Sequence, residues 1–354
     1  MFRNVYFCIM NSSAPIFFKT ARIALILTLL VILAGSVVRV TQSGMGCPDW
    51  PRCFGYYIPP THESDVRFCP GRFYKKGMML IERDTLWRAN ADFSAAAEFN
   101  SADWEKYPKH DYATFVVYQT WVEYINRLLG ALLGLVILVL VAFSFRFRKT
   151  KPMLMAYSFA LLFLTGFQAW LGKLVVDGNL IPQSISIHML AALVILWVLM
   201  LVLYGKESGA PRIGNKLFST IGLVLVGLTT VQILIGTQVR EEIDEIAEAT
   251  GYIDRSTWID TLSSMFTLHK VFSLTVAALG AMIYALRKKI SDAWFNKVAN
   301  AIGYVLLAEI GLGLIMTYGE VPRFAQSLHL LFSAILFCLA TRMFLGTRAG
   351  SISS

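Results

Sequence analysis

Long apolar runs dominate the chain and alternate with short polar segments. Each of eight runs carries few charges and, at about 20 residues, is long enough to cross a hydrocarbon core roughly 30 Å thick. Backbone groups in lipid find no water to bond, so each run is expected to be helical. The runs cover residues 22–40, 121–145, 153–176, 185–204, 217–239, 263–286, 298–318 and 325–344. The pattern predicts an all-α integral membrane protein with eight transmembrane helices.

Composition supports this class of protein. Of the 354 residues, 56% are hydrophobic and 16% are charged, compared with roughly 45–50% and about 25% in soluble domains. The mean hydropathy is +0.57. The net charge of +9 is spread over short Lys and Arg clusters between the apolar runs, which is typical of membrane topology rather than of a phosphate-binding track. We therefore expect contact with the lipid bilayer and no nucleic-acid partner.

Basic residues are distributed unequally between the two ends of the predicted helices. Sixteen Lys and Arg lie at the termini and after the second, fourth and sixth helices, whereas the short connections after the third, fifth and seventh carry three. The positive-inside rule then places both termini in the cytoplasm. The first apolar run lacks a small-residue cleavage site, so we expect it to be retained. The predicted location is a bacterial-type inner membrane, with residues 1–21 as a cytoplasmic N-terminus.

A long extracytoplasmic loop, residues 41–115, separates the first two helices. It contains Cys47, Cys53 and Cys69, and an oxidising compartment favours disulfides. Two prolines between Cys47 and Cys53 restrict the chain, so a bridge between these two residues is sterically plausible. Such a bridge could staple the loop or take part in redox chemistry, and Cys69 is either free or an alternative partner.

Two other segments are read as connections between the helices. Residues 82–104 of the long loop mix acidic, basic and aromatic side chains, and we expect a helix packed on the membrane surface there. The segment 241–248, after the fifth apolar run, contains five acidic residues and is expected to be a loop.

The chain contains an internal repeat. The first helix ends in Gly35-x-x-x-Arg39 and the fifth in Gly236-x-x-x-Arg240. At an offset of 141, Gln168, Gly172, Gly178 and His188 match Glu309, Gly313, Gly319 and His329. This pattern predicts two tandem four-helix bundles related by a pseudo-two-fold axis along the membrane normal. The units are expected at residues 22–204 and 217–345, with a cytoplasmic linker at 205–216 and a tail at 346–354.

Three histidines lie near the extracytoplasmic starts of helices: His188, His269 and His329. Ionisable side chains at membrane depth are costly and usually functional. His269 and His329 begin helices of one predicted bundle, and two imidazoles can take both axial positions of a haem iron. Zinc would need further ligands. The second unit is therefore expected to hold a haem, with satisfied core histidines as the alternative.

The first unit carries altered residues at the matching positions. His188 corresponds to His329, but Asn126 replaces His269, and an amide is a poor ligand for iron. One side of an iron there would stay open to bind oxygen. Glu123 lies one helical turn before Asn126, where a carboxylate suits proton transfer or the orientation of water. Pairing of Glu123 with Arg127 is the structural alternative.

Glycines and basic residues at the same outer level complete the candidate set. Gly172, Gly236 and Gly313 could leave room for a porphyrin or permit close helix packing. Four cations could pair with haem propionates or extend toward lipid headgroups. They are Arg39, Arg127, Arg240 and Lys270.

These motifs resemble the haem A synthase family, which matures haem O into haem A for cytochrome oxidases. The resemblance is carried by Gly35-x-x-x-Arg39-x-Thr41-x-Ser43-Gly44-x-x-Cys47-Pro-Asp-Trp-Pro-x-Cys53, by Glu123-Tyr-x-x-Arg127, and by the three helix-start histidines. It implies two four-helix halves, a haem b held by His269 and His329, and haem O bound in the first half, where one ring methyl becomes a formyl group. It further implies that Glu123 is needed for activity and that Cys47 and Cys53 matter for turnover or haem transfer.

The chain departs from the family at Asn126, where the family usually has a histidine. His188 is then the expected ligand in the first half, and the loop residues His62 and His110 could substitute only in principle. We expect an oxidoreductase that hydroxylates the haem O methyl while haem b transfers electrons. A bis-histidine cytochrome that only oxidises quinol is the alternative, and a transporter is a third. Candidate partners are a haem O synthase, a membrane electron donor and a second copy of the chain.

Overall fold

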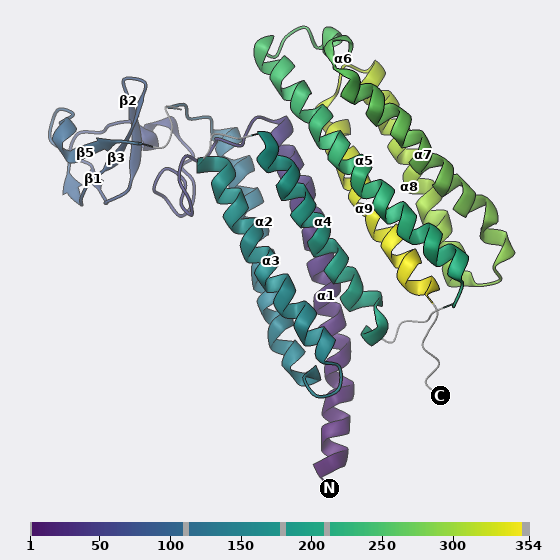
Figure 1. Ribbon diagram of the computed structural model, residues 1–354. Coiled ribbons are helices and arrows are strands. Elements are labelled where there is room, and N and C mark those ends of the chain that lie inside the picture. Colours follow the sequence, from purple (N-terminus) through teal and green to yellow (C-terminus); the bar gives the residue numbers. More distant parts are fainter. Residues whose placement is uncertain (1, 109–112, 178–181, 209–212, 349–354) are drawn as a thin grey trace.

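Eight long helices form the body of the molecule (Figure 1). The computed structural model describes residues 2–108, 113–177, 182–208 and 213–348. Within these residues, eight helices are long and apolar enough to cross a membrane, as the hydrophobic pattern predicts. They are α1 (Phe2–Val40), α2 (Val117–Ser144), α3 (Pro152–Asp177), α4 (Pro182–Tyr204), α5 (Lys216–Ala249), α7 (Ser264–Leu286), α8 (Ala293–Tyr318) and α9 (Arg323–Thr347). The prediction of an all-α membrane protein is confirmed.

Two apolar cores hold the helices together. One core joins α1, α2, α3 and α4 through fully buried residues such as Phe17, Ile137 and Leu161. The other joins α4, α5, α7, α8 and α9, and it reaches Ile32 of α1. Trp197 of α4 stacks on Phe344 of α9, with ring centroids 5.9 Å apart. The pseudo-two-fold relation between the two halves stays a prediction.

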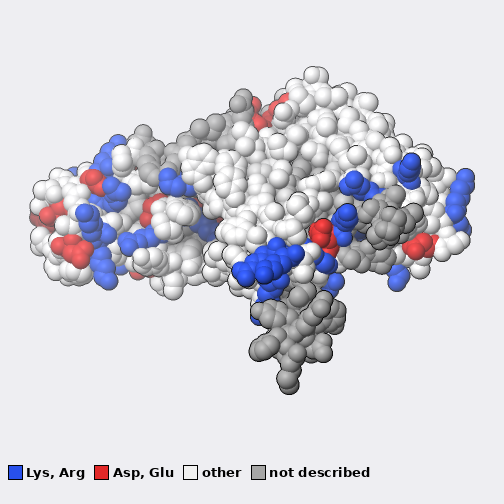
Figure 2. Space-filling view, turned by 60° about the horizontal axis from the view of Figure 1, so that its bottom comes forward, with Lys and Arg blue, Asp and Glu red and all other residues white. Residues whose placement is uncertain are grey.

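Charge is sparse on the helix flanks. Figure 2 shows largely uncharged surface along the helices, with Lys and Arg grouped near the end from which the N-terminal part of α1 emerges. Burial of apolar side chains inside the molecule is modest in several of the spans; only 17% of the apolar window in α7 is buried, for example. Apolar side chains that face outward along such helices are expected to contact lipid.

The acidic segment after the fifth apolar run is helical, so the predicted loop at 241–248 is wrong. α5 continues to Ala249 because this stretch holds good helix formers, Glu, Ala and Ile, and contains no Pro or Gly. The helix stops just before Gly251, which adopts a positive φ of 60°. A short helix, α6 (Trp258–Thr261), follows and packs its buried Trp258 against the end of α5.

The loop between α1 and α2 forms a small β unit, residues 54–107, which we name the β insertion. β2 (Met79–Glu82), β3 (Thr85–Ala89) and β5 (Trp104–Lys106) form an antiparallel sheet in the order β2-β3-β5. β1 (Phe73–Tyr74) pairs with β4 (Phe93–Ser94). The predicted surface helix over 82–104 is therefore wrong. Figure 1 shows the insertion beside one end of the helices, projecting to the side.

A tight hairpin turn explains the strands. Arg83 and Asp84 both adopt positive φ, 51° and 56°, between β2 and β3. Two consecutive residues of this kind make the turn whose twist matches antiparallel strands. Short 3₁₀ segments complete the described structure, at Glu63–Val66, Ser101–Asp103, Phe145–Phe147, Lys206–Ser208, Arg255–Thr257 and Arg287–Lys289.

Candidate functional site

The polar residues of interest gather at one end of the helices, which we name the disulfide end. It comprises the C-terminal ends of α1, α3, α5 and α8 and the N-terminal ends of α2, α4, α7 and α9 (Figure 1). Cys47 and Cys53 form a disulfide there, as the sequence indicated. Both cysteines are fully buried between α2 and the β insertion. Cys69 is free and exposed.

The disulfide loop lies directly on α2. A β-carbon at Gly46 would lie 2.6 Å from the backbone carbonyl of Gln119, so only glycine allows this approach. The Thr120 hydroxyl donates to the Gly46 carbonyl at 2.9 Å. On the other side, the Tyr107 hydroxyl of the β insertion donates to the Pro48 carbonyl at 3.0 Å. The loop is therefore held between the membrane helix and the insertion.

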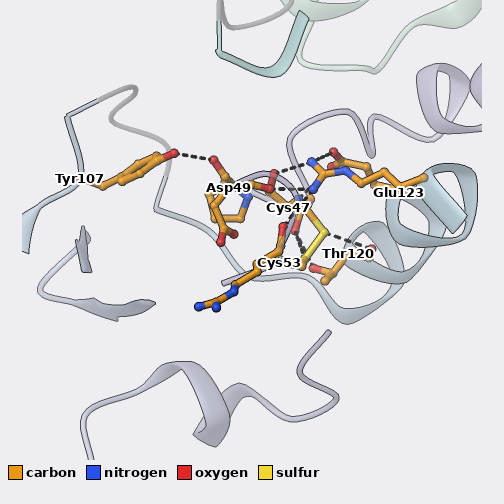
Figure 3. Close-up of polar contacts among 10 residues, drawn as sticks. Cys47, Asp49, Cys53, Tyr107, Thr120 and Glu123 are labelled. Carbon is orange, nitrogen blue, oxygen red and sulfur yellow. Dashed lines mark hydrogen bonds and ion pairs between the residues drawn. A yellow bond between two sulfur atoms is a disulfide. The ribbon is translucent and has the colours of Figure 1, made fainter. Parts of the chain in front are cut away.

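Glu123 and Arg127 of α2 bind the disulfide loop; Figure 3 shows Glu123 beside Cys47. The Cys47 N–H donates to Glu123 Oε2 at 2.8 Å, while Glu123 Oε1 is paired with Arg127. Arg127 also donates to the carbonyls of Asp49 at 2.6 Å, Arg52 at 3.1 Å and Cys47 at 3.0 Å. The structural alternative for Glu123, pairing with Arg127, is thus the arrangement observed. Glu123 is 3% exposed, so this ion pair lies in a largely dry environment.

Asp49 is the acidic residue of the disulfide loop. Its Oδ2 accepts the Gly55 N–H at 3.0 Å, whereas its buried Oδ1 has no hydrogen-bond partner among the described residues. Burial raises the pKa of Asp49 above the ordinary value of 3.8, against the opposing effects of the Gly55 hydrogen bond and the Arg127 charge. The loop therefore contains a carboxyl group whose charged form is disfavoured by the fold.

The first-half candidates lie on two different helices. His188 of α4 has a buried Nδ1 without a partner, and a β-carbon at Gly172 would lie 3.7 Å from its ring. Gln168 donates to the His188 backbone carbonyl at 3.0 Å. Asn126 of α2 has a buried, unpartnered Oδ1, and Gly35 is its neighbour on α1. Both side chains therefore present polar atoms that nothing in the described protein satisfies.

The second-half candidates face each other. The imidazole rings of His269 on α7 and His329 on α9 have centroids 6.3 Å apart and planes at 68°. A β-carbon at Gly236 of α5 would lie 3.1 Å from the His269 ring, so α5 approaches this ring closely. Gln232 places its side-chain amide 3.1 Å from His269 Nδ1 and donates to the His269 backbone carbonyl. On α8, Glu309 Oε2 lies 2.5 Å from His329 Nδ1.

The predicted cations bind protein groups. Arg39 of α1 and Arg240 of α5, which the repeat makes equivalent, contact the two oxygens of one carboxylate, Asp244, at 2.6 and 2.5 Å. Arg127 is occupied by the loop as described above. Lys270 places its Nζ 4.3 Å from the centroid of the Phe266 ring, a cation–π contact. Their pairing with haem propionates or lipid headgroups stays a prediction.

The residues present fit a haem in the second half. Two imidazole–metal bonds of about 2.0 Å on opposite sides of one metal place ring centres roughly 6 Å apart, and the two rings are separated by 6.3 Å. The unpartnered Nδ1 of His188 offers a single ligand in the first half, where the fit is to a group held from one side. His62 is exposed on the β insertion, and His110 lies outside the described residues.

Three polar residues at this end were not among the predicted site residues. Asp244 fell in the supposed acidic loop, and Gln232 gave no signal of its own. Glu309 carried a signal, since the repeat aligns it with Gln168, but no role followed from that alone. A carboxylate inside an apolar run is costly to bury, and this cost is the sequence feature that could have singled it out.

The fold and these sites define a class: a polytopic helical membrane protein with a histidine pair on α7 and α9 and a disulfide loop bound to α2. A family model confirms this class and narrows it. The model of the cytochrome oxidase assembly proteins COX15-CtaA matches residues 19–70 and 76–341. The chain belongs to this family.

Relatives agree with this assignment. A protein named heme A synthase from Shewanella oneidensis is 25% identical over 245 residues, which cover 68% of this chain and 62% of that protein. Proteins of the same name from Rickettsia massiliae and Rickettsia bellii are each 23% identical. The alignments cover 90% and 88% of this chain and 94% and 92% of those proteins. The resemblance based on the sequence motifs is thereby confirmed.

Proposed function

We propose that the protein is a membrane oxidoreductase of haem A biosynthesis that converts a ring methyl of haem O into a formyl group. Two successive hydroxylations give a diol, which loses water to leave the aldehyde. Each hydroxylation inserts one atom of dioxygen and consumes two electrons and two protons, with the second oxygen atom leaving as water. Family membership and the names of the relatives support the substrate class.

The asymmetry of the two halves carries this proposal. In the second half, His269 and His329 would hold a haem b from both sides, and such a group supplies one-electron transfer when bound. In the first half, His188 would hold haem O from one side, opposite a face bordered by Asn126 rather than by a second imidazole. An electron-transfer cytochrome would be expected to have a pair of imidazoles in each half.

Glu123 is the residue proposed to handle protons or water next to the substrate. It lies one turn from Asn126, at the boundary between the membrane helix and the disulfide loop. Arg127 balances its charge, and the Cys47 N–H orients one of its oxygens. Glu123 therefore has two separable roles, holding the loop and moving a proton, and a pair of substitutions can tell them apart.

The test is a comparison of Glu123→Gln with Glu123→Ala in cells that also produce haem O. Glutamine can still accept the Cys47 N–H but cannot carry a proton, whereas alanine loses both functions. We expect both variants to retain the absorption of the second-half haem and to lose haem A, measured by extracting and separating the porphyrins. If Glu123→Gln converts haem O at the wild-type rate, Glu123 only holds the loop and does not transfer a proton. Haem b alone in the wild-type protein would contradict the enzyme assignment.

Both termini are proposed to lie in the cytoplasm, with the disulfide end facing the extracytoplasmic side. The asymmetric distribution of Lys and Arg supports this orientation. The buried disulfide at that end agrees with an oxidising compartment. The units at residues 22–204 and 217–345 are proposed as the substrate and haem b halves. A haem O synthase, a membrane electron donor and a second copy of the chain remain proposed partners.

A further inference from the structure

Glu309 is an acidic side chain that the proposed mechanism does not use. It lies in the middle of α8, and its side chain is 11% exposed. Oε2 is 2.5 Å from His329 Nδ1, and Oε1 accepts the Ser333 hydroxyl at 3.0 Å. The His329 Nδ1 atom is itself buried. Among the described residues it makes no hydrogen bond of regular geometry, and the Glu309 carboxylate is its polar contact. An oxygen and a nitrogen at this separation repel each other unless one of them carries a proton.

The contact determines which ring nitrogen of His329 is available. A proton shared between Nδ1 and the carboxylate leaves Nε2 with its lone pair free. Histidines that bind metals usually donate their other ring N–H to a carboxylate, a carbonyl or water, which fixes the ring and makes it a stronger donor to the metal. Glu309 holds the position of such a partner on a helix adjacent to the ligand.

The matching position in the first half lacks a carboxylate beside the histidine ring. The repeat aligns Glu309 with Gln168 and Ser333 with Ala192. Gln168 donates to the His188 backbone carbonyl, and within the part of the chain that the structure describes the His188 Nδ1 has no hydrogen-bond partner. The carboxylate is therefore specific to the half that carries the imidazole pair. A purely structural contact between α8 and α9 would not need to reach the ring nitrogen.

We propose that Glu309 is a positioning residue for His329, which directs Nε2 toward the iron and lowers the reduction potential of the second-half haem. The inference rests on the proposed function, because it assumes that His269 and His329 hold that haem. A carboxylate that pulls on the Nδ1 proton increases the negative charge on the ring, and this charge favours the oxidised iron. The second-half haem would then be the better electron donor of the two.

The experiment is a redox titration of the purified, haem-loaded protein, followed by its absorption spectrum, with Glu309→Gln and Glu309→Ala beside the wild type. Glutamine keeps the size of the side chain and removes its charge. At a fixed potential near the midpoint, we expect the ratio of reduced to oxidised haem to rise about tenfold in Glu309→Gln, which corresponds to 59 mV for one electron. Glu309→Ala should shift at least as far. Ser333→Ala removes only the hydrogen bond donated to Glu309 Oε1. It should give a smaller shift in the opposite direction, because the carboxylate then pulls harder on the Nδ1 proton.

The outcomes separate this inference from the proposed function. A wild-type protein without a six-coordinate haem spectrum would overturn the function and the inference together. A loaded Glu309→Gln protein with the wild-type midpoint potential would overturn the inference alone. If Glu309→Ala fails to bind haem, the titration of Glu309→Gln still decides, because its shape is unchanged. A shift confined to Glu309→Ala would show a packing effect and would also overturn the inference.

Discussion

The two halves of the disulfide end carry different side chains at positions that the repeat makes equivalent. In the second half, two imidazoles face each other, with Glu309 against one and Gln232 against the other. In the first half, the equivalent positions present His188 and Asn126, with unpartnered polar atoms. The charged pair there, Glu123 and Arg127, is directed at the disulfide loop instead.

The difference lies in what surrounds the ring nitrogens. In the second half, Glu309 lies 2.5 Å from His329 Nδ1 and Gln232 lies 3.1 Å from His269 Nδ1, whereas no polar side chain among the described residues pairs with His188 Nδ1. This contrast agrees with the proposal that the second half binds a cofactor and the first half a substrate. The disulfide loop is bound by Glu123 and Arg127, which lie on either side of Asn126 along α2.

Removing an imidazole of the pair should have the largest effect. We expect His269→Ala and His329→Ala each to abolish the six-coordinate haem spectrum of the isolated protein, because one remaining ligand cannot hold the iron from both sides. His62→Ala is the matched control, since His62 is exposed on the β insertion, and its spectrum should equal that of the wild type. An intact spectrum in either membrane variant would refute the proposed ligand pair.

Breaking the Glu123 clamp should have the next largest effect. Arg127→Ala leaves a buried carboxylate without its partner and frees three loop carbonyls, so we expect a loss of about 3–5 kcal/mol in stability. The measurement is thermal unfolding in detergent, together with the rate at which a reductant opens the Cys47–Cys53 bridge.

The control for this change is a pair of similar chemistry on the surface. Arg67 and Glu63 also form an i,i+4 ion pair, but their side chains are 48% and 65% exposed. Arg67→Ala should cost about 0–1 kcal/mol and leave the reduction rate unchanged. Equal effects of the two substitutions would mean that the clamp contributes nothing beyond an ordinary surface pair.

The membrane helices and the family could be predicted from the sequence because their physical signals are strong. An apolar run of about 20 residues has few alternatives in lipid. The motif around Cys47 and Cys53 is specific in combination with Glu123-Tyr-x-x-Arg127, and the prolines restrict the loop enough to favour the bridge. The predicted helix bounds differ from the observed ones by a few residues, with two exceptions. α1 begins at Phe2 rather than at residue 22, and α5 ends at Ala249 rather than at residue 239.

The rest could not be predicted because its signals are weak or ambiguous. The β2–β3 turn uses Arg83 and Asp84 in a conformation that Asn-Gly would have revealed. The extension of α5 reads as a polar loop when charge alone is considered, and Asp244 was missed with it. The contact of Arg39 with Asp244 spans 205 residues and that of Arg127 with the Cys47 carbonyl spans 80, and a pattern along one chain does not encode such tertiary contacts.

The smallest predicted effect concerns Asp49 and is visible only as a dependence on pH. Burial raises the pKa of Asp49 in the folded protein. Just above the ordinary pKa of Asp, the unfolded chain therefore releases a proton that the folded protein still holds. Its contribution to stability is thus present at acid pH and is lost as the pH rises through the folded-state pKa.

The substitution Asp49→Asn tests this dependence. Asparagine keeps an acceptor for the Gly55 N–H, and because it does not titrate, the loss of stability at higher pH disappears. We expect the unfolding temperature of the variant to match that of the wild type at acid pH and to exceed it at neutral pH. Asp92→Asn, which alters an exposed carboxylate that accepts the Lys76 N–H, should show no such divergence. Parallel pH curves for wild type and Asp49→Asn would mean that the Arg127 charge, rather than burial, governs this carboxyl group and that the loop above the first half is wetter than its packing indicates.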